Sequence, residues 1–167
     1  MLKFLARAAL GRWTIALLNI LIIFVVVSSL SHVLGALTKT DFIEPGTERF
    51  EEMIDIISGM GVILIAYGVA LEERASLREV FGISGQADHE KEAPLDHFCH
   101  LAGAGQLLLG LFSEIGVECV RIPNDVINTE NIEHIVLGFS VALLLLGMAF
   151  LLVATIRLAF GNFGRHV

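Results

Sequence analysis

Charge is scarce in this sequence. Charged residues make up 17% of its 167 residues, whereas 55% are hydrophobic. Two long runs, Trp13–Leu37 and Ile135–Ile156, contain no Asp, Glu, Lys or Arg. Each run exceeds the roughly 20 apolar residues that cross a hydrocarbon core about 30 Å thick. A water-soluble helical bundle needs a polar face on every helix, so this composition argues against one.

Cysteine is equally scarce. The chain has two, Cys99 and Cys119, and both fall in one predicted helix. At about 1.5 Å of rise per residue they lie about 30 Å apart, so they cannot form a disulfide with each other. Two cysteines also do not make a disulfide framework.

The sequence lacks the common catalytic and nucleotide-binding motifs. It contains no P-loop, no Rossmann glycine pattern, no Gly-x-Ser-x-Gly, no Cys-x-x-Cys and no Cys-x-x-Cys-His. The net charge is −7 and no basic tract occurs, so nucleic acid is not an expected partner. We therefore expect a protein that is not an enzyme, unless histidines and carboxylates supply the chemistry.

Two further apolar segments carry isolated charges, Asp55 in one and Glu114 in the other. With the two uncharged runs they predict an all-α membrane protein, an antiparallel bundle of four transmembrane helices in one domain over residues 1–167. The predicted spans cover about 13–37, 53–71, 97–117 and 135–156. The first is about twice as long as the apolar region of a signal peptide, which favours a span over a cleaved leader.

The segments outside the spans are short. Met1–Arg12 is predicted to be an amphipathic lead along the inner surface. Residues 83–94 are polar and are predicted to form a cytoplasmic linker. That linker is closed by Pro94, which suits the first turn of the third span.

Lysine and arginine predict the orientation. With the N-terminus inside, the inner side holds Lys3, Arg7, Arg12, Arg74, Arg78, Lys91, Arg157 and Arg165. The outer side then holds Lys39, Arg49 and Arg121. This bias follows the positive-inside rule and places both termini in the cytoplasm, most simply at a bacterial inner membrane.

The polar residues of the third span form one stripe. At about 100° per residue, four polar residues, two glycines and one leucine fall within about 80° of the helix circumference. They are Asp96, His100, Gly103, Leu107, Gly110, Glu114 and Glu118. Small residues allow close helix packing and polar residues avoid lipid, so we expect this stripe to face the bundle interior. The predicted packing residues are Gly103, Gly110, Gly59 and Gly138.

The predicted topology brings four polar residues, one from each span, to the outer boundary. They are His32, Asp55, Glu114 and His134. Imidazoles and carboxylates from facing helices can hold iron, manganese or zinc, and His32 with His134 could ligate a b-type haem. The di-iron motif Glu-x-x-His is missing, so helix ends that meet water, with no cofactor, are the simpler interpretation. Asp96, His97 and His100 form a second polar cluster at the inner side.

Glu114 is the strongest single candidate for a functional residue, because an ionisable side chain in an apolar span costs free energy. We expect it to point inward and to pair with His32, Asp55 or His134.

Three functions fit these features. The favoured one is a non-catalytic accessory or structural subunit of a larger membrane complex, respiratory or photosynthetic, because the parts outside the membrane are too small for a separate domain. Its partners are the lipid bilayer and other membrane-protein subunits. The first alternative is a homo-oligomeric channel or transporter whose acidic outer mouth attracts cations, although no charged residue falls at mid-membrane. The second is a membrane redox protein that binds a metal or haem.

Overall fold

The computed structural model describes residues 8, 10–38, 47–83, 86–122, 126–127, 129 and 132–160. Within these ranges the chain forms five helices and no strand. They are α2 (Arg12–Thr38), α3 (Glu48–Glu72), α4 (Arg74–Val80), α5 (Gln86–Arg121) and α6 (Glu133–Phe160). Most of the predicted amphipathic lead, residues 1–7 and 9, lies outside the described residues.

Four of these helices, α2, α3, α5 and α6, are long and apolar enough to cross a membrane. Each predicted span lies inside one of them, which confirms the all-helical class and the four apolar segments. The start of α3 also has a local cause. The Thr47 side chain accepts a hydrogen bond from the Phe50 amide at 3.4 Å, and Glu48 and Glu51 lie in the positive first turn.

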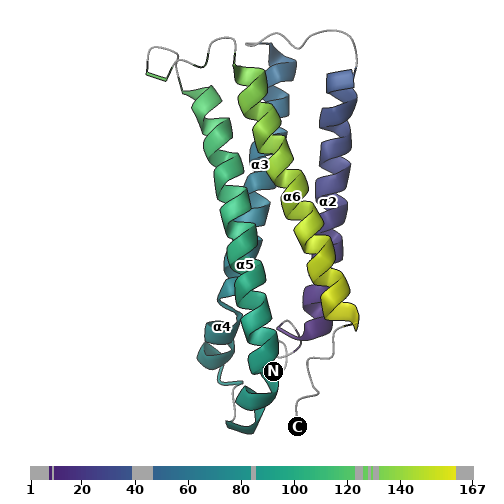
Figure 1. The fold of residues 1–167 in the computed structure, drawn as a ribbon, viewed down its shortest axis with the longest axis vertical. Helices are drawn as coiled ribbons and strands as arrows, with labels where there is room; N and C mark the ends of the chain where they lie inside the picture. Colours follow the sequence, from purple (N-terminus) through teal and green to yellow (C-terminus); the bar gives the residue numbers. More distant parts are fainter. Residues whose placement is uncertain are drawn as a thin grey trace.

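The long helices stand side by side, and α5 packs against both α3 and α6 (Figure 1). Along α3 and α5 the residue numbers run in opposite directions, because Gly68 lies against Gly103 whereas Gly61 lies against Gly110. The same holds for α5 and α6, where Gln106 bonds Gly147 and Ser113 bonds Ser140.

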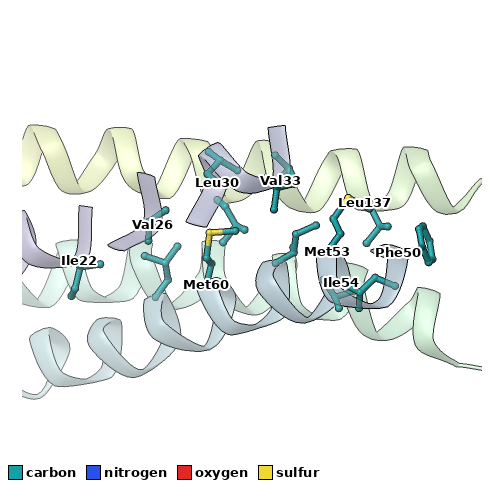
Figure 2. Packing of buried hydrophobic residues seen from close by; sticks show 14 of the residues in the cluster. Ile22, Val26, Leu30, Val33, Phe50, Met53, Ile54, Met60 and Leu137 are labelled. Atoms are coloured by element: carbon teal, nitrogen blue, oxygen red, sulfur yellow. The ribbon is translucent and has the colours of Figure 1, made fainter. Parts of the chain in front are cut away.

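The core is apolar along most of its length. From α2, the side chains of Ile22, Val26, Leu30 and Val33 face Met53 and Met60 of α3, and α6 adds Leu137 (Figure 2). A smaller cluster lies near the start of α2 and consists of Ile15, Ala16, Leu71, Leu95, Cys99 and Leu158. In a membrane, such contacts between apolar helices stabilise a bundle mainly through close packing.

The segment between α3 and α5 differs from the sequence prediction. Most of the predicted linker 83–94 is helical, because α5 already begins at Gln86 and contains Pro94. An internal proline costs a helix about 3 kcal/mol, so a compensating interaction is required. The helical path places Glu92 and Asp96 one turn apart on one face, where both reach the arginines of α4.

The turn after α4 contains a positive backbone angle. Gly82 has φ 62°, and the amide of Ile83 donates to the carbonyl of Arg78 at 3.0 Å. This is the Schellman arrangement that ends helices at glycine. It reverses the chain so that α5 returns alongside α4.

Candidate functional site

Two buried arginines form the most strongly polar site of the described chain. Arg74 and Arg78 are only 2% and 6% exposed. The Arg74 guanidinium donates to Glu92 Oε2 at 2.7 Å and to the Leu10 carbonyl at 2.9 Å, and it pairs with Asp96 through Nη1. This residue therefore joins α4, α5 and the segment that precedes α2.

Arg78 completes the cluster. Its Nη1 donates to Asp96 Oδ2 at 3.0 Å and lies 3.6 Å from Glu92 Oε2. Two cations thus face two anions, which leaves the cluster formally neutral. Buried ion pairs lose hydration, so their gain over an apolar core is small, but removal of one partner is costly. The geometry indicates a rigid joint between α4 and α5.

The inner polar cluster predicted from sequence is divided in the structure. Asp96 belongs to the arginine cluster, whereas His97 is exposed. The His100 side chain is also exposed, with Nδ1 3.9 Å from Glu72 Oε1. Sequence reasoning missed Arg74 and Arg78. The available signal was a pair of arginines four residues apart and a pair of carboxylates with the same spacing, which face each other as two helical ridges.

The four outer residues are not gathered into one site. Asp55 is exposed and pairs with Arg121, which also bonds Glu118 at 2.9 Å. His134 lies edge-on to the Phe50 ring, with 6.1 Å between centroids. In the described ranges, no group of three or more His, Cys, Asp and Glu residues is placed to hold a metal.

The structure does not turn the two histidines of the predicted haem pair into the bundle. His32 and His134 both lie on outward, exposed faces of their helices. On α2, the face buried in the core carries Val26, Leu30 and Val33, and this turns His32 away from the bundle. Asp55 is exposed as well, so neither Asp55 nor His32 points into the bundle.

Glu114 lies on the side of α5 that faces α3, but its partner differs from the prediction. The Ser58 hydroxyl donates to Glu114 Oε1 at 2.7 Å. The other carboxyl oxygen, Oε2, is buried and has no hydrogen-bond partner among the described residues. It occupies space that Gly61 leaves open, because a Cβ added there would lie 3.0 Å from Oε2. A serine and a glycine on α3 therefore accommodate Glu114, in place of the predicted histidines or Asp55.

This geometry predicts that Glu114→Gln is tolerated. The amide keeps an oxygen that accepts from Ser58 and removes the cost of a partly buried charge. Unfolding in detergent should occur at the same or a higher denaturant concentration than in the wild type. Ser58→Ala is the matched comparison and should cost about 1 kcal/mol. If Glu114→Gln loses more stability than Ser58→Ala does, the negative charge itself is needed.

Two amide side chains are fully buried between helices. Asn19 accepts a hydrogen bond from the Tyr67 hydroxyl, which joins α2 to α3. Gln106 donates to the Gly147 carbonyl at 2.8 Å, which joins α5 to α6. Such bonds between apolar helices contribute about 0.6–2 kcal/mol each and define the register. Neither amide was assigned a role from the sequence.

The predicted packing glycines divide into two groups. A Cβ on Gly103 would lie 2.5 Å from the Gly68 carbonyl, and one on Gly110 would lie 2.8 Å from the Gly61 carbonyl. These two glycines lie at close contacts between the backbones of α3 and α5. By contrast, a Cβ added at Gly59 or Gly138 would meet nothing within 4 Å, so neither glycine packs closely against the described residues. The face of α3 that carries Gly59 turns outward together with Asp55.

The described residues therefore define a helical protein whose four candidate spans indicate an integral, multi-pass membrane protein. Comparisons with protein-family models, with curated proteins and with solved structures found no match. Any function must be argued from the residues of this chain.

Proposed function

We propose that this chain is a non-catalytic accessory subunit of a larger integral-membrane complex, in which its four long helices cross the bilayer as an antiparallel bundle. The lengths of α2, α3, α5 and α6 support insertion. The opposite course of neighbouring helices supports the alternating topology. A role in assembly requires no catalytic site in this chain.

One observation carries the proposal, namely the outward face of α3. Asp55, Gly59, Ala66 and Ala70 are all exposed on it. A glycine inside a helix costs about 1 kcal/mol relative to alanine, and Gly59 makes no compensating contact among the described residues. Small residues let a second helix approach closely, whereas lipid gains nothing from them. We infer that another subunit packs against this face.

The alternative of a channel requires several copies. Leu64, Leu144 and Leu151 are buried in the middle of the bundle, so an aqueous path would have to run between chains. Native mass spectrometry separates the two functions, because an accessory subunit associates with chains of other masses and a homo-oligomer only with copies of itself.

The test is to purify the protein in mild detergent with and without Gly59→Leu. The wild type should retain partner chains of different mass, and the variant should lose them, because leucine fills the position where a partner approaches. The fold should be unchanged, since nothing lies within 4 Å of Gly59. Ala142→Leu, on an exposed part of α6, is the control and should retain the partners. A monomer in all three samples would contradict the proposal.

Orientation has its own test. A reporter fused after Val167 should be active only in the cytoplasm, because eight of the eleven lysines and arginines fall on the predicted inner side. The same reporter inserted after Gly46, in the first predicted outer loop, should show the opposite result. Export of the C-terminal reporter would reverse the proposed topology.

A further inference from the structure

An apolar groove runs along the exposed surface where α5 and α6 meet. Its larger part is a cavity of about 530 Å³ whose lining includes Gly105, Leu146 and Ala149. A second cavity of about 280 Å³ shares Phe150 and Val153 with it and reaches Arg157. The two cavities therefore form one continuous groove. Arg157 is the only charged residue in the lining of either cavity.

The length of this groove matches one leaflet of a bilayer. Leu146 and Arg157 lie about three helical turns apart, which is roughly 16 Å along α6. The hydrocarbon core of a bilayer is about 30 Å thick, so the groove spans about half of it. Its apolar end then lies near mid-membrane, and its charged end lies at the level of the lipid headgroups.

Arg157 differs from the other described arginines near this end of the bundle. Arg74 and Arg78 are neutralised by Glu92 and Asp96. Arg12 donates to the carbonyls of Leu158 and Ala159. Arg157 is exposed, and no described carboxylate lies within ion-pair distance of it. A positive charge at the open end of an apolar groove complements an anion that carries a hydrocarbon chain.

We propose that this groove seats one acyl chain of an anionic phospholipid and that Arg157 holds its phosphate. The site rests on the membrane insertion proposed above. A guanidinium binds phosphate oxygens through paired N–H donors, and the predicted orientation places Arg157 in the leaflet that is richer in anionic lipid. The Phe150 ring packs against Gly105, where an added Cβ would lie 3.0 Å from the ring. The ring therefore occupies part of the groove, and the space that is left suits a thin acyl chain. A protein helix in the same place would bury the charge of Arg157 against apolar neighbours.

Native mass spectrometry tests the site. The purified full-length protein is incubated with an equimolar mixture of dioleoyl phosphatidylglycerol and dioleoyl phosphatidylcholine. The wild type should retain one phosphatidylglycerol, with about a fivefold preference, the factor that one basic residue contributes near an anionic surface. Arg157→Gln should abolish the preference, and Ala149→Phe should remove both lipids because its ring fills the groove.

Two controls match these variants. Arg49→Gln removes an exposed arginine at the other end of the bundle. Leu152→Phe adds a ring on an exposed face of α6 that belongs to the lining of neither cavity. Both should retain the wild-type preference. The proposal is overturned if Arg157→Gln and Arg49→Gln show the same preference for phosphatidylglycerol. It is also overturned if Ala149→Phe still binds phosphatidylglycerol. Release of a bound protein chain by Ala149→Phe would also overturn it, by placing a protein in the groove.

Failure of this inference can be told apart from failure of the proposed function. A chain that does not fractionate with membranes would refute the insertion on which both depend. A chain that fractionates with membranes and retains its partner subunits, but shows no lipid preference, would refute only the lipid site.

Discussion

Replacing Gly103 with leucine should separate α3 from α5 and unfold much of the bundle. A Cβ added at this position would lie 2.5 Å from the Gly68 carbonyl and even closer to the Glu72 amide nitrogen. Both are backbone atoms, so no side-chain movement relieves the overlap and the helices must move apart. Overpacking usually costs about 1–3 kcal/mol, and we expect at least the upper end of that range. Denaturant titration in detergent, followed by circular dichroism, measures the loss.

Gly59 provides the matched control. Alanine at this position meets nothing within 4 Å and restores helix propensity, so Gly59→Ala should be neutral or stabilise the isolated chain by up to about 1 kcal/mol. Gly138→Ala should behave in the same way, because its surroundings are equally open. Similar losses at Gly103 and Gly59 would mean that the contact between α3 and α5 is not the close approach described here.

Asp96→Ala should be the most damaging single change at the arginine cluster. It removes the carboxylate that contacts both Arg74 and Arg78, and these cations stay buried with too few partners. Breaking a buried ion pair from one side costs about 3–5 kcal/mol. Glu92→Ala should cost less, because the Glu92 side chain is 39% exposed and water can replace part of its interaction.

Two further variants give this prediction its control. Asp55→Ala breaks an exposed pair with Arg121 and should cost no more than about 1 kcal/mol. A triple variant that changes Asp96 to Ala and both Arg74 and Arg78 to Met should recover stability relative to Asp96→Ala, since apolar side chains replace the unpaired charges. If Asp96→Ala lowers the free energy of unfolding no more than Asp55→Ala does, water must reach the two arginines.

The helical elements could be predicted from sequence because their determinants are local. An apolar run of the length of Trp13–Leu37 or Ile135–Ile156 requires internal backbone hydrogen bonds wherever water is excluded, and a helix supplies them within one segment. The inward-facing stripe of α5 could also be predicted from local sequence. Its glycines and Glu114 fall on one side, and both kinds of residue favour helix contact over lipid.

The candidate site residues were less predictable. Asp55 and His32 were candidates for a shared metal site, yet both are exposed. The core is filled from other helix faces by Val26, Leu30 and Ile57. An apolar helix offers several faces that could be buried, and the neighbouring helices select among them. The sequence also predicted that Gly59 packs inside the bundle, because a glycine pattern does not distinguish a contact within the chain from an exposed position.

The sequence by itself determined how many long apolar helices this protein has, where they lie along the chain, and the polar stripe on α5. Only the tertiary structure decided which side chains meet. Arg74 reaches Asp96 because the chain turns at Gly82, and Glu114 reaches Ser58 because α3 and α5 approach at glycines. Helix formation depends on hydrogen bonds over one turn, whereas these pairs join residues many positions apart, so their geometry exists only after the helices have packed.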